Sequence, residues 1–209
     1  MMIIYHRGRH GTINSLTYKE NSLEAFALAV QEGAEMVEFD VWNDLRVAHD
    51  PGANTNAPTL TQVLDLINAR CAVNIEVKGP EAADVVAEEV ERRLASGKWE
   101  SEQFVLSSFH HQTASDLKGR LWMCRVGAVF DCVPLPGCVG FLAGKVDQVH
   151  IEKANMEMDR QFYGLLRTEL EGYNMPIWVW TVNTQEEYGR AVQYGAKAIF
   201  TDRPDLFRP

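Results

Sequence analysis

The amino-acid sequence predicts a (β/α)8 barrel, or TIM barrel, in which residues 1–209 form one domain. Short apolar runs alternate with amphipathic segments along the whole chain, and this alternation is typical of a parallel sheet covered by helices. Eight strand-like runs occur without a glycine-rich dinucleotide loop, which favours a closed barrel over a doubly wound sheet. The expected strands are residues 2–6, 36–42, 71–78, 102–109, 123–130, 148–153, 176–183 and 198–201.

Helical periodicity predicts helices between most of these strands. Ser22 is a suitable N-cap for the first helix, and Val86, Val90 and Leu94 share one face of the third. The expected helices are residues 22–33, 59–70, 82–96, 111–121, 159–173 and 184–195. Prolines and glycines in residues 133–144 permit one short helix at most. Few residues follow the last strand, so we expect a compact barrel with a short or missing last helix.

Composition and charge limit the classes of protein to which the chain can belong. A chain of 209 residues with 46% hydrophobic and 23% charged residues is ordinary for a globular protein. No apolar run approaches the roughly 20 residues that span a bilayer, and the N-terminus is strand-like, so we expect no transmembrane segment and a cytoplasmic location. The net charge of −9 argues against nucleic-acid or anionic membrane partners, but local cations can still bind a small phosphate ester.

Two carboxylates share one face of the second expected strand. Residues two apart on a strand point the same way, so Glu38 and Asp40 point to one side, and Val37, Phe39 and Val41 point to the other. Crowded carboxylates repel each other and lose hydration on burial unless a positive group lies between them. The pattern therefore indicates either a cation site at the mouth of the barrel or an ordinary strand with acids on its solvent side.

Two histidines and two cationic residues stand at or just after the ends of expected extended segments, and His49 ends a short extended piece, residues 45–49, that follows the second strand. His6 and His49 are candidates for a general acid and a general base, because imidazole donates and accepts protons near neutral pH. The alternative for each is an ordinary structural histidine. Arg7 and Lys78 would place fixed positive charge at the mouth of the barrel, and they can also pair with neighbouring acids such as Glu20.

Several blocks of the sequence, taken in order, resemble those of the glycerophosphodiester phosphodiesterases. The blocks are His6-Arg7-Gly8, Glu20-Asn21-Ser22-Leu23-Glu24-Ala25-Phe26, Glu38-Phe39-Asp40-Val41, His49-Asp50-Pro51, Asn74-Ile75-Glu76-Val77-Lys78, Leu106-Ser107-Ser108-Phe109, Trp180-Thr181-Val182-Asn183 and Thr201-Asp202-Arg203-Pro204-Asp205. Together they span nearly the whole chain. The resemblance implies a phosphoric diester hydrolase that releases glycerol phosphate and an alcohol such as choline or ethanolamine.

The resemblance assigns metal binding to Glu38, Asp40 and Glu76. These three residues offer only oxygen ligands, which suits a hard divalent cation, Mg²⁺ or Ca²⁺, rather than zinc. For Glu76 taken alone, a salt bridge with Lys78 is the alternative. Which of the two metals is bound stays open.

The resemblance also implies how the substrate is held and cleaved. Arg7 and Lys78 would neutralise charge on the phosphoryl group, while His6 and His49 would move protons on opposite sides of phosphorus. Which histidine acts as acid and which as base stays open. Glu152 ends a polar row on the sixth expected strand, and it is either an extra pocket carboxylate or part of a buried structural network.

Four further residues are expected around this centre. Glu20 would hold Arg7 by a charge-assisted hydrogen bond, with metal ligation as a second option, and Asn21 would support the site beside it. Trp180 and Phe109 would line the alcohol side of the substrate pocket, and plain core packing is the alternative for both.

Two departures from the family pattern affect the mouth of the barrel. Residues 50–58 are a short connection where family members usually carry a longer insertion, so no sizeable cap is expected. Residues 9–19 form a longer loop than usual that carries His10, and this loop is a candidate for replacing part of the cap.

Two functions are compatible with these features. The first is metal-dependent hydrolysis of a small glycerophosphodiester by His/His acid–base catalysis. The second is binding of a phosphate ligand, or scaffolding, on a degenerate barrel without turnover, which needs the cations but not both histidines. The preferred alcohol, a cyclic phosphate intermediate and the oligomeric state stay open.

Overall fold

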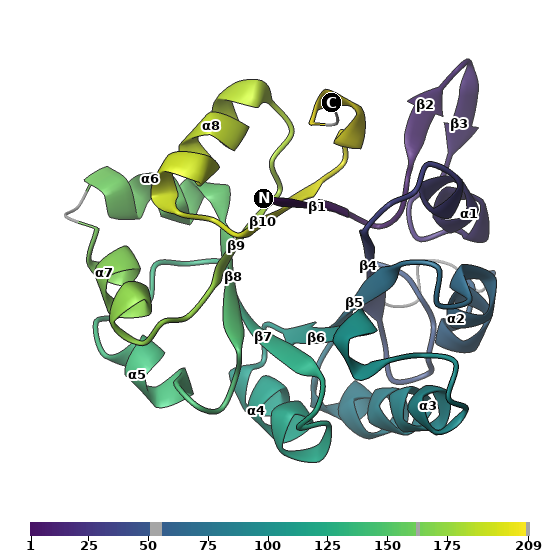
Figure 1. The fold of residues 1–209 in the computed structure, drawn as a ribbon, viewed down its shortest axis with the longest axis horizontal. Helices are drawn as coiled ribbons and strands as arrows, with labels where there is room; N and C mark the ends of the chain where they lie inside the picture. Colours follow the sequence, from purple (N-terminus) through teal and green to yellow (C-terminus); the bar gives the residue numbers. More distant parts are fainter. Residues whose placement is uncertain (51–55, 162–163, 208–209) are drawn as a thin grey trace.

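The structure of the protein is a computed structural model that describes residues 1–50, 56–161 and 164–207. Within them, eight strands form a closed barrel in which neighbouring strands are parallel (Figure 1). Around the barrel they are β1 (Met2–Tyr5), β10 (Ala198–Thr201), β9 (Ile177–Trp180), β8 (Gln148–Glu152), β7 (Arg125–Phe130), β6 (Phe104–Ser108), β5 (Ala72–Val77) and β4 (Met36–Val41). The predicted TIM barrel is confirmed.

Helices surround the barrel, as Figure 1 shows. They are α1 (Leu23–Gln31), α2 (Leu60–Ile67), α3 (Ala83–Ala95), α4 (His111–Arg120), α5 (Cys138–Leu142), α6 (Lys153–Gln161), α7 (Leu165–Gly172) and α8 (Gln185–Tyr194), with short 3-10 helices η1 (Pro80–Ala82), η2 (Ser101–Gln103) and η3 (Pro204–Leu206). In the described part of the chain, only η3 follows β10, as expected for a short last helix.

Residues of the barrel strands alternate between the two sides of the barrel wall. In β4, Met36 belongs to the apolar cluster inside the barrel. Phe39 points outward, where its ring lies 5.4 Å from that of Phe26 in α1. All six residues of β4 are buried. Glu38 and Asp40 share the side of Met36, so they point into the barrel, away from the apolar residues between them.

Residues 8–20 contain a β-hairpin where the sequence predicted only a loop. Strands β2 (Gly11–Ile13) and β3 (Leu16–Tyr18) pair antiparallel. Asn14 and Ser15 join them with φ values of 50° and 68°, the left-handed backbone that a tight two-residue hairpin turn requires. Each strand is too short to show a period of two, which explains the missed assignment.

The single helix predicted over residues 159–173 is wrong, because α6 and α7 occupy this segment instead. Helix α6 begins earlier, directly after β8, and a second helix, α7, begins at Leu165. The buried carboxylate of Asp159 accepts hydrogen bonds from the backbone N–H groups of Leu166 at 2.9 Å and Arg167 at 3.1 Å. A residue of α6 thus caps the N-terminus of α7, a tertiary contact that local periodicity does not reveal.

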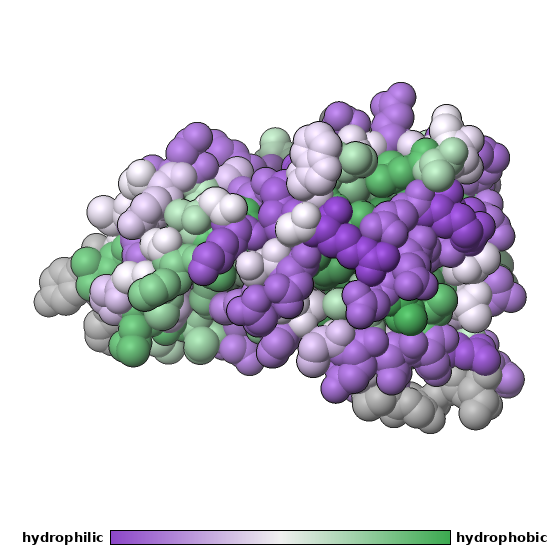
Figure 2. All heavy atoms as spheres, turned by 90° about the horizontal axis from the view of Figure 1, so that it is seen from below, coloured by the Kyte–Doolittle hydropathy of each residue, from purple (hydrophilic) through white to green (hydrophobic). Residues whose placement is uncertain are grey.

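The surface is mostly hydrophilic on the face that Figure 2 shows. Hydrophobic side chains gather at its left end, the side on which α5, α6 and α7 lie in Figure 1. Among the described residues, no helix combines the length and apolar character needed to cross a membrane.

Candidate active site

A cavity of about 140 Å³ lies at the mouth of the barrel. It brings together eight residues that the sequence had singled out: His6, Arg7, Glu38, His49, Glu76, Lys78, Phe109 and Trp180. Asn74, Val129, His150 and Phe200 complete its lining. Most of these residues lie in or just after a barrel strand, where parallel strands deliver side chains to one common opening.

Three carboxylates converge on one side of this cavity. Strand β4 carries Glu38 and Asp40, and the register of β4 and β5 pairs Asp40 with Glu76. One oxygen from each of the three side chains lies within 4.8 Å of the others. Glu38 and Asp40 are each only 2% exposed. The pairing of β4 with β5 therefore brings together a set of oxygen donors, the kind of ligand that Mg²⁺ and Ca²⁺ prefer.

Two cationic side chains contact the carboxylates. The Nζ of Lys78 lies 2.8 Å from Oδ1 of Asp40 and also contacts Oε1 of Glu76. The Nε of Arg7 lies 3.4 Å from Oδ2 of Asp40. The backbone N–H of Arg7 donates to Oε2 of Glu38 at 3.0 Å. Asp40 is thus held between both cations, whereas Glu38 receives a neutral donor.

The pKa values of the acids follow from these contacts. Burial raises the pKa of Glu38 well above its ordinary value, and the carboxylates of Asp40 and Glu76 raise it further. Burial also raises the pKa of Glu76, although Lys78 opposes the shift. Burial would raise the pKa of Asp40 too, but Lys78 and then Arg7 bring it below the ordinary value. The cluster therefore lacks positive charge mainly around Glu38, since Lys78 contacts both Asp40 and Glu76.

A divalent cation fits this charge deficit. Glu20 joins the group through its contact with Arg7, so four carboxylates surround the guanidinium and the Lys78 ammonium. With all four ionised, two negative charges remain, which is the charge that one divalent ion would balance. Glu38, Asp40 and Glu76, whose oxygens lie within 4.8 Å of one another, could hold such an ion.

The segment before α1 fixes the position of Arg7. Oε1 and Oε2 of Glu20 each accept a hydrogen bond from one guanidinium nitrogen of Arg7 at 3.1 Å. The Nδ2 of Asn21 donates to Oδ2 of Asp40 at 2.9 Å. Arg7 and Asn21 both have a φ of 54°, and a Cβ at the neighbouring Gly8 would lie 3.1 Å from atoms of α1. Non-glycine residues in this left-handed region concentrate at functional sites.

The two candidate histidines have different surroundings. The Nδ1 of His6 lies 2.7 Å from Oδ1 of Asp202, and its Nε2 lies 3.9 Å from Oε2 of Glu38. The Nδ1 of His49 lies 3.0 Å from Oδ1 of Asp50, and its side chain is 43% exposed. His6 is thus fixed inside the site, while His49 reaches the cavity from the solvent side.

Aromatic residues line another part of the cavity wall. The rings of Phe109 and Trp180 meet edge to face, with centroids 5.6 Å apart. The Nε1 of Trp180 is buried and has no hydrogen-bond partner among the described residues. His150 stacks on Trp178 at a centroid distance of 4.8 Å, and burial lowers its pKa to about 3. This wall therefore contains a neutral imidazole and an unpaired indole donor.

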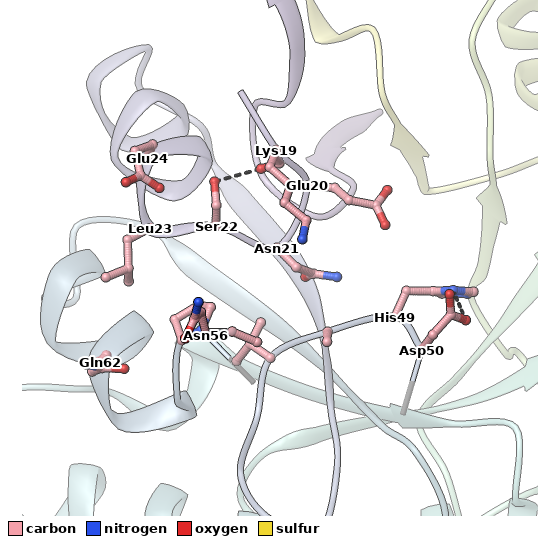
Figure 3. A pocket seen from close by; sticks show the side chains of 14 residues that line it. Lys19, Glu20, Asn21, Ser22, Leu23, Glu24, His49, Asp50, Asn56 and Gln62 are labelled. Carbon is pink, nitrogen blue, oxygen red and sulfur yellow. Dashed lines mark hydrogen bonds and ion pairs between the residues drawn. The ribbon is translucent and has the colours of Figure 1, made fainter. Parts of the chain in front are cut away.

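A second cavity of about 350 Å³ adjoins the first and shares His49 with it. Figure 3 shows this cavity with Glu20 and Asn21 on the segment before α1, and with His49 and Asp50 across from them. The predicted short connection over residues 50–58 lies here, but residues 51–55 of it fall outside the described residues. This second cavity extends the mouth beyond the carboxylates and the aromatic wall.

Two other sequence-predicted residues lie outside the main cavity. Glu152 at the end of β8 is absent from its lining, so the idea of an extra pocket carboxylate is not supported. The Nε2 of His10 lies 3.1 Å from Oδ1 of Asp202 and turns toward a separate cavity rather than over the mouth. The sequence suggested no individual role for Asp202, yet its carboxylate contacts both His6 and His10.

Comparisons with known proteins agree with the fold. The solved structure of a glycerophosphodiester phosphodiesterase from Thermotoga maritima matches with a TM-score of 0.76 at 24% identity, covering 99% of this chain and 96% of that one. An Oleispira antarctica phosphodiesterase, solved in complex with the product sn-glycerol-3-phosphate, matches with a TM-score of 0.76 at 20% identity, covering 98% and 94%. At these identities, the likeness shows a shared barrel.

Sequence comparisons identify the family. A curated glycerophosphodiester phosphodiesterase from Caldanaerobacter subterraneus subsp. tengcongensis is 24% identical over 249 residues, which cover 98% of this chain and 95% of the relative. The sequence model of the Glycerophosphoryl diester phosphodiesterase family matches residues 6–43 and 42–206. The chain therefore belongs to the glycerophosphoryl diester phosphodiesterase family, and its enzyme class is that of the phosphoric diester hydrolases.

Proposed function

We propose that the protein hydrolyses a glycerophosphodiester to glycerol phosphate and an alcohol, with the help of one divalent cation and two histidines. The observation that carries this proposal is the convergence of acids, cations and both histidines on one cavity. The complex of the Oleispira antarctica relative with sn-glycerol-3-phosphate supports glycerol phosphate as the product. The net charge of the cluster supports a divalent ion, Mg²⁺ or Ca²⁺, held by Glu38, Asp40 and Glu76.

The cationic side chains would bind and orient the phosphoryl group. When bound, the divalent ion would supply electrophilic stabilisation of the charge that develops on the phosphoryl oxygens. Arg7 and Lys78 would add fixed positive charge on the same side of the cavity. Both are held in place before substrate arrives, Arg7 by Glu20 and Lys78 by Asp40. This preorganisation means that little side-chain reorganisation is required during the reaction.

The two histidines would move the protons of the reaction. Cleavage of a diester needs one group to deprotonate the nucleophile and another to protonate the departing alkoxide. His6 and His49 line the same cavity from different segments, so one can serve each side of the phosphorus. The nucleophile is a water molecule or a hydroxyl group of the substrate itself, and in the second case a cyclic phosphate forms first.

The aromatic wall would receive the organic part of the substrate. Phe109 and Trp180 offer an apolar surface, and Lys78 lies 5.7 Å from the centroid of the Phe109 ring. The unpaired N–H of Trp180 would donate a hydrogen bond to a substrate hydroxyl, since a buried donor gains most from a partner. The wall would thus bind the substrate beside the phosphoryl site.

An assay of glycerophosphocholine hydrolysis tests this function. We expect the purified protein to release glycerol phosphate with Mg²⁺ or Ca²⁺ present, to lose activity after treatment with a chelator, and to regain it when the ion is returned. Detection of a cyclic phosphate before glycerol phosphate would identify a substrate hydroxyl as the nucleophile. Turnover that survives complete metal removal would refute the metal dependence.

The same assay separates hydrolysis from simple ligand binding. A binding or scaffold protein would bind glycerol phosphate but turn over no diester, and replacing both histidines would leave that binding intact. If the wild type shows no turnover on any diester while binding glycerol phosphate, the binding function replaces the one proposed here.

A further inference from the structure

Asp202 connects two histidines that come from different parts of the fold. Strand β1 pairs with β10 so that Tyr5 faces Thr201, and this register places His6 beside Asp202. The Oδ1 of Asp202 lies 2.7 Å from Nδ1 of His6 and 3.1 Å from Nε2 of His10. One carboxylate oxygen therefore contacts both rings.

Asn183 holds the other end of the same carboxylate. Its Nδ2 donates to Oδ2 of Asp202 at 2.8 Å, and its Oδ1 accepts from the backbone N–H of Asp202 at 2.9 Å. Burial would raise the pKa of Asp202, but hydrogen bonds from His10 and His6 hold it well below the ordinary value. The side chain is thus an ionised carboxylate with partners on both oxygens.

These contacts determine where the hydrogens of the two rings lie. An ionised carboxylate only accepts hydrogen bonds, so Nδ1 of His6 and Nε2 of His10 must both carry a hydrogen. In a neutral His6 ring, Nε2 is then the nitrogen with the free lone pair. That nitrogen lies on the side of Glu38, at 3.9 Å from its Oε2, and His6 lines the main cavity.

A metal ion does not explain this second cluster as well as hydrogen bonds do. His6, His10 and Asp202 have possible ligand atoms within 4.8 Å of one another, so a metal ion is an alternative explanation for the cluster. Two ligands of one tetrahedral zinc ion lie about 3.3 Å apart. The 2.7 Å and 3.1 Å separations in the cluster are shorter and match N–H···O hydrogen bonds.

His10 is itself held in place by the segment that carries it. The adjacent Arg9 is buried, its Nε lies 3.2 Å from Oε1 of Glu32, and its Nη2 lies 3.2 Å from Oδ1 of Asp205. These ion pairs connect the start of the β2–β3 hairpin to α1 and to the segment after β10. The hairpin segment therefore presents His10 to Asp202 in a fixed position.

We propose that Asp202 and His10 are positioning residues that keep His6 in the tautomer with hydrogen on Nδ1 and a free Nε2 toward the cavity. This inference rests on the proposed role of His6 in proton transfer. Asp202 accepts the hydrogen of His6 Nδ1, and His10, together with Asn183, prevents the carboxylate from rotating away. A hydrogen bond to the second ring nitrogen is the usual way in which a protein selects a histidine tautomer.

Substitutions at position 10 test the proposal through turnover. His10→Leu removes the N–H donor at similar volume, so kcat for glycerophosphocholine should fall about tenfold while KM stays unchanged. His10→Gln retains an N–H at a comparable distance and should keep most of the wild-type kcat. Thr12→Ala, an exposed site in the same hairpin, is the matched control and should have no effect. Asp202→Ala should lower kcat by about 100-fold or more.

The tautomer of His6 gives a second readout that does not depend on activity. In the metal-free protein labelled with ¹⁵N-histidine, the His6 signals should show hydrogen on Nδ1 in the wild type and in His10→Gln. His10→Leu should show a mixture of the two tautomers, and Asp202→Ala should lose the preference. Signals are assigned by comparison with His6→Gln.

The two readouts separate this inference from the proposed function. If His6 has the expected tautomer but no diester is cleaved, the proposed function fails and the positioning network stands. If wild-type His6 carries its hydrogen on Nε2, the inference is overturned whatever the activity. It is also overturned if His10→Leu keeps both the wild-type kcat and the wild-type tautomer.

Discussion

The two sides of the barrel mouth accommodate buried titratable groups in different ways. On the side of β1, β4 and β5, charged groups contact one another, as Asp40 does with Lys78 and Arg7. On the side of β8 and β9, the buried His150 is neutral, because burial lowers its pKa to about 3. His150 packs there against Trp178 and Phe200.

This difference indicates that the two sides of one small cavity suit different parts of the substrate. Charged groups are costly to bury and are kept only where they interact with other charges or with ions. With its four carboxylates ionised, the acidic side carries two more negative than positive charges, and so it suits a cation and, with that cation, the phosphoryl group. On the aromatic side, the free-energy cost of burial is lower because the buried imidazole of His150 is neutral. This side suits the organic part of the substrate. Substitutions on the two sides should therefore change different kinetic constants.

The largest effects are expected for the histidines on the charged side. His6→Ala and His49→Ala should each lower kcat by roughly 100- to 10,000-fold, because each removes one proton-transfer group. KM and the affinity for the divalent ion should change little. Steady-state kinetics, together with metal titrations of both variants, test this. Comparable loss of metal affinity would show that the histidines act by holding the ion instead.

A smaller effect on a different constant is expected for the aromatic wall. Trp180→Ala removes apolar contact and one N–H donor, so it should raise KM for glycerophosphocholine about tenfold with a lesser change in kcat. Trp122→Ala is a matched control, since Trp122 is 70% exposed and outside the lining of the cavity. If Trp180→Ala instead lowers kcat and leaves KM unchanged, the indole acts in the chemical step. The two sides of the cavity would then not differ in the kinetic constant that they control.

The last of these effects concerns stability rather than catalysis, on the neutral side of the cavity at low pH. Unfolding brings the pKa of His150 from about 3 back to its ordinary value near 6.5, so between these values the unfolded chain binds more protons. The free energy of unfolding should therefore fall as pH decreases from 6.5, by at most about 1.4 kcal/mol per pH unit from this residue. Urea unfolding at several pH values should show a shallower decrease for His150→Gln. Identical slopes for both proteins would contradict the neutral assignment.

The barrel could be predicted from the sequence because its strands and helices bury apolar residues with regular spacing. The alternation in β4 put Glu38 and Asp40 on the inner face, where the structure has them. The β2–β3 hairpin could not be predicted in the same way. Each strand has only three residues and none of them is buried, so the alternation of Thr12 and Thr17 with Ile13 and Leu16 is too short to stand out as a pattern.

Site residues could be predicted where they lie on one strand or on consecutive strands. They could not be predicted where two segments far apart in the sequence meet. Glu38 and Asp40 lie together in the sequence, and Glu76 follows on the next strand of the barrel. His6 and Asp202 are 196 positions apart and become neighbours only when β1 and β10 close the barrel. The sequence did hold one signal, since the first and last strands of a closed barrel must pair. Asp202 follows the last strand directly, just as His6 follows the first.

The contrast between the two sides depends above all on the charged side, where we expect the acidic cluster to bind one divalent ion. Calorimetric titration of Mg²⁺ and Ca²⁺ into the metal-free wild type should show one site, and Glu38→Gln should weaken it by at least about tenfold. Glu88→Gln, at an exposed acid on α3, should bind like the wild type. Metal-free Glu38→Gln should unfold at the same temperature as the wild type or higher, because one repelling carboxylate is gone, and added metal should raise its melting temperature less. A Glu38→Gln variant that binds metal normally but melts earlier without it would show that these acids serve structural salt bridges instead.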